Sequence, residues 1–213
     1  MAREGLPFLV VSVAIALSLL VASRSVPGLI YGAGIFGIMS LFMAYFFRDP
    51  ERISPAEPNL VLAAADGKVV GIEQVESEVH DGNVAVQIST FLSIFDVHVN
   101  RVPVSGVVHF VRWQGNCFRA AFVDAASSDN HQSVIGIKTD AALVVVKQIV
   151  GIIARRIVCH LRDGDAVEKG GRFGLIRFGS RVDLILPADS EIRVTVGDRV
   201  RAGVTIIGVL EDV

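Results

Sequence analysis

The chain has 213 residues, of which 52% are hydrophobic and 20% are charged, and its formal net charge is −2. Average soluble domains are about 45–50% apolar and about 25% charged. The apolar excess excludes intrinsic disorder, and the lack of bulk positive charge excludes a nucleic-acid binder driven by electrostatics. The two cysteines show neither a disulfide framework nor metal-ligand spacing, which favours a reduced domain that faces the cytosol.

Two uncharged stretches open the chain. Residues 5–23 and 25–47 contain no charged side chain, and Arg24 alone separates them. Each stretch is close to the roughly 20 apolar residues that a membrane-spanning helix needs. Residues 23–28 contain Pro27 and Gly28, which break helices. The sequence therefore predicts a membrane-anchoring helical hairpin over residues 1–47 and a second domain over residues 48–213.

The basic residues around this hairpin indicate its orientation. Arg3, Arg48 and Arg52 flank its two ends, and Arg24 lies at its turn. Because cytoplasmic segments carry the excess of Lys and Arg, the ends are expected in the cytoplasm, at the cell membrane. A secretory signal peptide is disfavoured because a second apolar stretch follows at once. A shallow hairpin that does not cross the bilayer stays open, and in either case a lipid surface favours a lipid substrate.

Beyond residue 47 the pattern changes from long apolar stretches to short ones. A polar, Pro-rich connector covers residues 48–58, and from residue 60 short runs rich in Val and Ile are separated by Gly and Asp. Alternation with a period of two, with turn signals between the runs, is typical of β-strands. No segment has a 3.6-residue apolar stripe. The sequence predicts a mainly β domain of the barrel or sandwich type with few helices.

One seven-residue pattern occurs twice. Residues 164–170 (GDAVEKG) and 197–203 (GDRVRAG) share the form G-D-x-V-x-x-G, and each precedes an apolar strand that contains Ile. Asp in such a turn bonds nearby backbone, and Gly supplies a positive φ angle. The pattern resembles the turns of lipoyl and biotinyl domains. Such carrier domains need a modifiable lysine at an exposed hairpin, and in the biotinyl case a methionine usually lies beside it. The methionines here are residues 1, 39 and 43, which all lie in the predicted membrane hairpin, so a carrier function is not expected.

A set of longer strings carries a more specific resemblance. They run in order along residues 46–187: FFRDPER (46–52), AAADGKVV (63–70), FLSIFDVHVNRVPVSG (91–106), CFRAAF (117–122), VKQIVGIIARRIVC (146–159), GDAVEKGGRFGLI (164–176) and RFGSRVDLILP (177–187). Together they resemble the phosphatidylserine decarboxylases in their short bacterial and archaeal form. By itself the Gly-Ser pair at residues 179–180 would indicate an ordinary bulge or tight turn.

The resemblance implies a proenzyme that cuts itself between Gly179 and Ser180. The products would be a β chain of residues 1–179 and an α chain of residues 180–213, which stay together as a heterodimer. Attack by the Ser180 hydroxyl would give an ester, elimination would release it, and hydrolysis of the resulting dehydroalanine would leave a pyruvoyl group and ammonia. Gly179 suits this bond because a residue without Cβ tolerates strained backbone.

The resemblance also assigns the residues that assist Ser180. His98 matches the family's catalytic histidine and Asp66 matches the acid that orients it. Together with Ser180 they would form a triad of orienting acid, base and nucleophile. Outside this match, a single histidine in a strand is usually structural, and an aspartate before glycine usually forms a turn.

One position departs from the family. Many bacterial members have a second histidine three residues after the first, and Arg101 occupies that position here. His98 is therefore expected to serve both self-cleavage and the later proton transfers. Arg101 either contacts the phosphate of the lipid head group, which a guanidinium suits, or is a solvated surface arginine.

The implied reaction is the decarboxylation of phosphatidylserine. The pyruvoyl group would form a Schiff base with the amine of the substrate and take up the electron pair as CO₂ leaves. His98 would reprotonate the product, and hydrolysis would release phosphatidylethanolamine. No metal is expected, because His, Cys and Asp are not clustered at ligand spacing.

Two other functions stay open. The chain would be a non-enzymatic, membrane-tethered β-sandwich adaptor if it stays intact and has no decarboxylase activity. It would be a serine hydrolase if Ser180 persists as the nucleophile in an uncut chain.

Overall fold

The structure is a computed structural model, and it describes residues 1–76, 84–117, 129–151, 156–177 and 180–211. The chain divides into two compact units, residues 1–50 and residues 51–213. This boundary lies slightly beyond the predicted one at residue 47. The N–H of Arg48 still donates to the carbonyl of Tyr45, so the first residues of the connector continue the helical unit.

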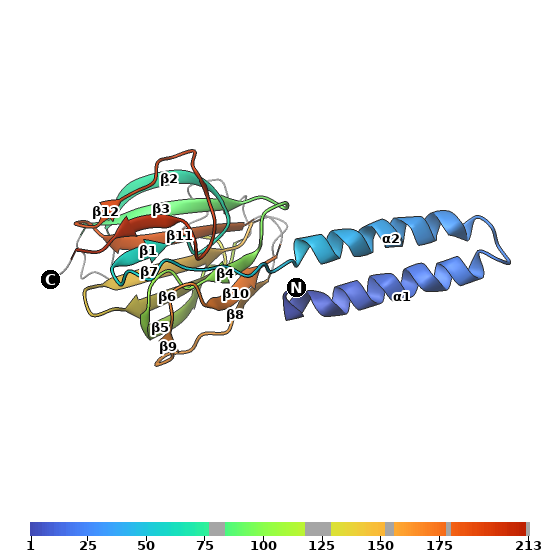
Figure 1. The fold of residues 1–213 in the computed structure, drawn as a ribbon, viewed down its shortest axis with the longest axis horizontal. Coiled ribbons are helices and arrows are strands. Elements are labelled where there is room, and N and C mark those ends of the chain that lie inside the picture. Colours follow the sequence, from blue (N-terminus) through green and yellow to red (C-terminus); the bar gives the residue numbers. More distant parts are fainter. Residues whose placement is uncertain (77–83, 118–128, 152–155, 178–179, 212–213) are drawn as a thin grey trace. The chain divides into compact units, whose positions relative to one another are not determined.

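The first unit is a helical hairpin (Figure 1). A short 3₁₀ helix, η1 (Arg3–Gly5), leads into α1 (Leu6–Ala22), and α2 (Leu29–Phe46) runs back after the turn at residues 23–28. The predicted hairpin is therefore confirmed. Both helices are apolar on all sides, and large side chains on them are exposed, including Ile38 at 71% and Leu41 at 74%. A helix that is apolar all round suits a protein core or a membrane, and here no protein covers most of it.

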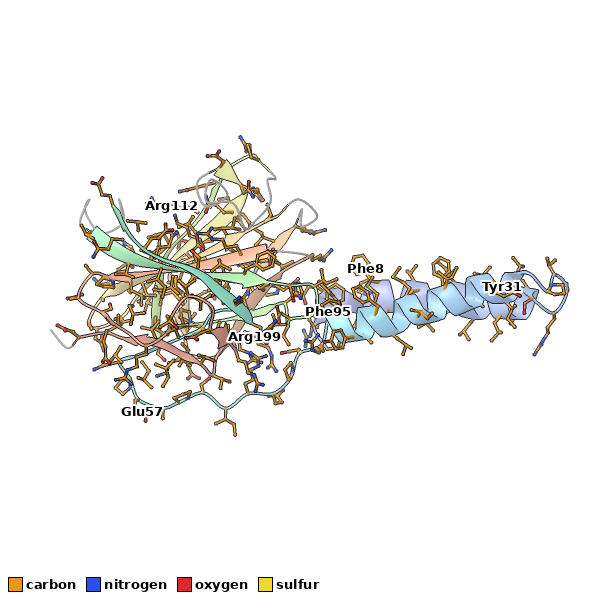
Figure 2. All side chains as sticks on the ribbon, turned by 90° about the horizontal axis from the view of Figure 1, so that it is seen from above. Phe8, Tyr31, Glu57, Phe95, Arg112 and Arg199 are labelled. Carbon is orange, nitrogen blue, oxygen red and sulfur yellow. The ribbon has the colours of Figure 1, made fainter. Side chains whose placement is uncertain are left out.

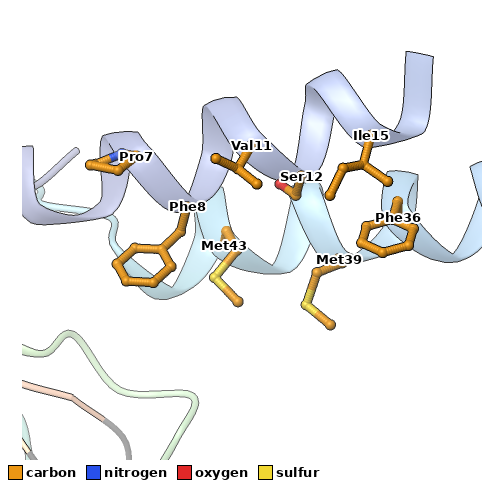
Figure 3. Close-up of a pocket in the computed structure, with 8 residues that line it drawn as sticks. All are labelled: Pro7, Phe8, Val11, Ser12, Ile15, Phe36, Met39 and Met43. Carbon is orange, nitrogen blue, oxygen red and sulfur yellow. The ribbon is translucent and has the colours of Figure 1, made fainter. Parts of the chain in front are cut away.

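A pair of serines joins the two helices. Ser40 Oγ lies 2.9 Å from Ser12 Oγ, and each hydroxyl also lies within 3.0 Å of a carbonyl oxygen of its own helix. Ser12 can donate to its carbonyl and accept from Ser40, so both hydroxyls have a partner among apolar neighbours. Beside Ser12 an apolar pocket of about 380 Å³ opens along the hairpin (Figure 3). It is lined by Pro7, Phe8, Val11, Ser12, Ile15, Phe36, Met39 and Met43.

The second unit is built from fourteen strands among the described residues. The strands are β1 (Leu60–Leu62), β2 (Gly67–Glu76), β3 (Val84–Leu92), β4 (Val99–Arg101), β5 (Gly106–Gln114), β6 (Gln132–Lys138), β7 (Leu143–Ile149), β8 (Ile157–Cys159), β9 (Ala166–Val167), β10 (Arg172–Ile176), β11 (Ser180–Pro187), β12 (Glu191–Ile192), β13 (Arg199–Val200) and β14 (Ile206–Val209). The predicted mainly β fold is confirmed.

The strands form three antiparallel sheets (Figure 1). An eight-stranded sheet has the order β13-β2-β3-β11-β7-β6-β5-β9, and two small sheets have the orders β1-β14-β12 and β4-β10-β8. The large sheet curls, and the main apolar core lies on its inner face. Val182 and Leu184 of β11 belong to that core, whereas Ile185 packs on the other face with Val145. Because both faces of β11 are buried, its second half, Leu184 to Leu186, is continuously apolar rather than alternating.

The repeated pattern marks two equivalent halves of this domain. In one half the N–H of Val69 donates to Asp198 O, and the N–H of Gly197 donates to Val69 O. In the other half Val108 makes the same two bonds with Asp165 and Gly164. The equivalent pairs are β13 with β2 and β9 with β5, and β14 with β1 and β10 with β4.

The repeats also confirm the predicted turn chemistry. Asp165 Oδ2 accepts the N–H of Arg162 and Asp198 Oδ2 accepts the N–H of Thr195, each at 2.8 Å. The closing glycines have φ angles of 81° (Gly170) and 69° (Gly203), a region that L side chains avoid. The two repeats therefore have a structural role as turns that lead into strands.

Candidate active site

Two chain segments meet where the large sheet joins the β4-β10-β8 sheet. Ser180 opens β11 and pairs with Leu92 at the end of β3, while Leu175 near the end of β10 pairs with Val99 of β4. Residues 92–99 therefore link the β3–β11 ladder to the β4–β10 ladder. Residues 176–180 link the same two ladders. His98 lies on the first segment and Ser180 at the end of the second, so the topology brings these predicted residues to one corner.

Ser180 is fully buried, and its Oγ makes no hydrogen bond with any described residue. A buried hydroxyl without a partner costs about 1–3 kcal/mol, so native proteins rarely keep one without a use. Ser180 is the first residue of β11, two residues before Val182 of the core, so its side chain lies on the inner face of the sheet. This is the position that a nucleophile held for an intramolecular reaction would take. Gly179, the other predicted cleavage residue, lies outside the described residues.

His98 is 2% exposed, and its Nδ1 lies 2.9 Å from the carbonyl oxygen of Asp96. A carbonyl can only accept, so Nδ1 carries the proton of this hydrogen bond. In the neutral ring Nε2 is then the basic nitrogen, as a general base requires.

Asp96 fixes the turn that holds His98, and the sequence analysis did not identify it. Its Oδ2 accepts the N–H of Ser93 at 2.8 Å and the hydroxyl of Ser93 at 2.7 Å. Arg199 lies 3.3 Å from Oδ1; Figure 2 labels this arginine and Phe95, which is exposed at the tip of the same turn. The Ser-x-x-Asp spacing at residues 93–96 is a turn signal that could have revealed this role.

Asp66 is buried and forms a bidentate ion pair with Arg52. The two distances are 2.5 Å and 2.8 Å, and the N–H of Ala202 donates to Oδ1 at 2.8 Å. The structure thus places Asp66 where the connector, β2 and the second repeat meet. Its assignment as the acid that orients His98 stays a prediction, and Arg52 is a partner that the sequence analysis missed.

Arg101 is 5% exposed, so the expectation of a solvated surface arginine is wrong. Its Nη1 donates to the carbonyl of Gly170 at 3.0 Å, and a Cβ on Gly203 would lie 2.8 Å from its Cδ. The arginine is therefore packed between the closing glycines of the two repeats, where the compact backbone leaves room for it. Contact with a lipid phosphate stays a prediction.

Three buried polar side chains, which we call the polar layer, lie on the inner face: Ser133, Gln148 and Asn100. Ser133 Oγ donates to Gln148 Oε1 at 2.8 Å, and Gln148 Nε2 donates to Asn100 Oδ1 at 2.8 Å. They come from β6, β7 and β4, and each is fully buried. The sequence analysis missed this layer because its members are far apart along the chain.

The outer face of the same sheet carries a buried charge cluster. Arg181 donates from Nε to Asp183 at 2.6 Å and from Nη2 to Ser89 Oγ at 2.6 Å. Lys147 pairs with Asp183 in the β7–β11 register. Desolvation lowers the pKa of Lys147 against the attraction of Asp183. These charges hold β11 in place immediately after Ser180.

The described residues suit the predicted prosthetic group, a pyruvoyl made from Ser180. Ser180 is buried, and its Oγ makes no hydrogen bond within the described part of the chain. The strand topology brings it to the same corner as His98, whose basic nitrogen is Nε2. Within the same part, no three His, Cys, Asp or Glu side chains are grouped to hold a metal ion.

Comparison with known proteins decides the family. Residues 39–208 match the profile of the family described as phosphatidylserine decarboxylase. The chain belongs to the phosphatidylserine decarboxylase family. Members of this family are carboxy-lyases, so the predicted family and enzyme class are confirmed.

Relatives in this family match the chain over almost its whole length. A phosphatidylserine decarboxylase proenzyme of Geobacter metallireducens is 43% identical over 98% of this chain and 96% of its own. The proenzyme of Symbiobacterium thermophilum is 44% identical over 97% and 94%, and that of Burkholderia cenocepacia is 40% identical over 99% and 96%. The alignments therefore include the N-terminal hairpin as well as the β domain.

Proposed function

We propose that the chain is a proenzyme that cleaves itself between Gly179 and Ser180 and then decarboxylates phosphatidylserine to phosphatidylethanolamine. The observation that carries this proposal is the Ser180 hydroxyl, which is buried and without a hydrogen bond among the described residues, on the segment that shares a corner with His98. The proenzyme names of the relatives support the same conclusion.

In the self-cleavage, His98 Nε2 takes the proton of the Ser180 hydroxyl as Oγ attacks the carbonyl carbon of residue 179. The amide C–N bond breaks, its nitrogen gains a proton, and an ester joins the two chain segments. Loss of the Ser180 Cα proton breaks the Cβ–Oγ bond, so Oγ leaves with the new C-terminal carboxylate of the β chain. One water then replaces the nitrogen, which departs as ammonia, and residue 180 becomes a ketone.

For the decarboxylation, a pyruvoyl group at position 180 would supply an electron-accepting carbonyl for the amine of the substrate. The chain's own residues supply proton transfer and shielding. His98 returns a proton to the product from Nε2, since its Nδ1 is committed to Asp96 O. The buried corner limits the access of water. Asp66 is proposed to orient His98, and Arg101 to interact with the phosphate.

The hairpin supports membrane attachment. Both helices are long and apolar enough to cross a bilayer, and few of their residues are buried in the protein. A soluble protein's core helix would instead be mostly buried. We infer that the hairpin anchors the enzyme in the cell membrane with the β domain in the cytoplasm, where a phospholipid substrate is within reach. The apolar pocket beside Ser12 suits a hydrocarbon chain.

The intact mass of the purified protein tests the proposal. We expect two chains, the shorter one starting at residue 180 with a ketone in place of the amine, and phosphatidylethanolamine produced from phosphatidylserine vesicles. Ser180→Ala should leave one chain without activity. A continuous wild-type chain without activity would favour the adaptor, and an uncut chain labelled at Ser180 by a fluorophosphonate would favour the hydrolase.

A further inference from the structure

The polar layer is oriented so that one hydrogen-bond donor is left over. Ser133 donates to the carbonyl oxygen of the Gln148 amide, which turns the NH₂ of Gln148 toward Asn100. Asn100 accepts this bond with Oδ1, and its own NH₂ therefore points elsewhere. Asn100 is fully buried, and its Nδ2 makes no hydrogen bond with the residues that the structure describes.

The strand registers place this donor near Ser180. Gln148 pairs with Val182 in the β7–β11 ladder, and Ser180 lies two residues before Val182 on the same face. Ser180 and Gln148 are thus diagonal neighbours, about 7–8 Å apart between Cα atoms, and Gln148 reaches Asn100 directly. Asn100 also lies two residues after His98. One buried region therefore holds a donor and a hydroxyl, neither with a hydrogen bond to a described residue.

We propose that Asn100 is a further catalytic residue, whose Nδ2–H donates a hydrogen bond to Ser180 Oγ as this oxygen loses its proton to His98. A donor aimed at developing negative charge in a dry site stabilises the transition state strongly. Gln148 and Ser133 act as positioning residues that fix the direction of the Asn100 amide. This role of Asn100 rests on the proposed self-cleavage, and it concerns the first step, the attack by Ser180 Oγ.

Asn100→Asp is the sharpest test, because it keeps the acceptor for Gln148 and replaces only the NH₂ donor. An ionised carboxylate cannot donate, whereas a protonated one can. Among the described titratable and charged groups, His98 lies two residues before Asn100, just outside β4, and Arg101 follows Asn100 on β4, while Lys147, Arg181 and Asp183 lie on the opposite face of the large sheet. Dividing the rate of the variant by that of the wild type at each pH cancels the titration that both proteins share.

The rate of self-cleavage would be followed on denaturing gels after pulsed cell-free synthesis of the full chain with lipid vesicles. At about pH 8 we expect Asn100→Asp to be roughly 100-fold slower than the wild type, and the ratio of the two rates should rise as the pH falls toward about 5.5. A ratio near one, or one that does not change with pH in a folded protein, would overturn the role of Asn100.

A matched pair of serines tests the positioning part. Ser133→Ala removes the hydroxyl that orients Gln148, and we expect it to slow self-cleavage several-fold. Ser190→Ala removes another buried hydroxyl, in the turn that follows β11 at its far end from Ser180, and the rate should stay at that of the wild type. Equal rates in the two variants would contradict the proposal even if Asn100→Asp fails to fold. A wild type that never cleaves would instead refute the proposed function itself.

Discussion

At the scale of single residues, the direction of one hydrogen bond defines the chemistry of His98. The Asp96 carbonyl can only accept, so it fixes the protonated nitrogen of the ring and leaves the other as the base. Asp96 is in turn held by Ser93 and Arg199. A rigid turn therefore orients the base, whichever role Asp66 has.

His98→Ala should slow self-cleavage by about 10²–10⁴-fold, the usual contribution of a general base. The gel assay would show the uncut chain accumulating. His109→Ala is the matched control, because His109 is an exposed histidine on β5, and it should be cut at the wild-type rate. Normal cleavage of folded His98→Ala would remove His98 from the base role.

Several of these residues could be predicted from the sequence and others could not. Ser180 and His98 lie within contiguous strings, so local sequence was enough to propose them. The ion pair of Arg52 with Asp66 and the bond from Gln148 to Asn100 join residues whose proximity depends on strand register, which no local pattern encodes. Arg101 was expected either at the lipid phosphate or in solvent because charged side chains are rarely buried, whereas the glycine turns leave space for it.

At the scale of elements, the two G-D-x-V-x-x-G turns were predictable because Gly and Asp act within a few residues of themselves. The order of the strands was not predictable. Alternation predicts a half-buried strand but not its partner, and β3 pairs with β11 across almost a hundred residues. The sequence therefore does not distinguish a barrel from a sandwich, whereas the structure has one curled eight-stranded sheet and two three-stranded sheets.

Gly203 gives a test at this scale. Alanine there would adopt a φ of 69° and place its Cβ 2.8 Å from Arg101 Cδ and 3.3 Å from Gly170 Cα. At Gly197, where φ is 108°, the same change meets nothing within 4 Å. Backbone strain costs about 1–2 kcal/mol at either site, and crowding adds about 1–3 kcal/mol at Gly203 alone.

The measurement is denaturant unfolding of both variants in a Ser180→Ala background, which is expected to keep a single chain. We expect Gly203→Ala to be clearly less stable than Gly197→Ala. Equal stabilities would show that Arg101 is not packed tightly against the second repeat. Since Arg101 ends β4, Gly203→Ala in the wild-type background should also slow self-cleavage.

At the scale of the whole molecule, the chain combines an apolar hairpin with a β domain that has its own buried core. The hairpin was predictable because two charge-free stretches around a Pro-Gly turn allow few alternatives. Its orientation rests on a small excess of arginine, with Arg24 at the turn and Arg3, Arg48 and Arg52 near the ends.

Cysteine labelling in intact cells tests crossing and orientation together. If the hairpin spans the membrane as proposed, a membrane-impermeant maleimide should label Ser25→Cys at the turn from outside the cytoplasmic membrane. Ile53→Cys, at a site that is 93% exposed in the β domain, should react only after the cells are opened. The wild type measures background from Cys117 and Cys159, and burial raises the pKa of the Cys159 thiol, which slows its reaction. Labelling of neither variant from outside would indicate a shallow hairpin, and labelling of Ile53→Cys alone would reverse the orientation.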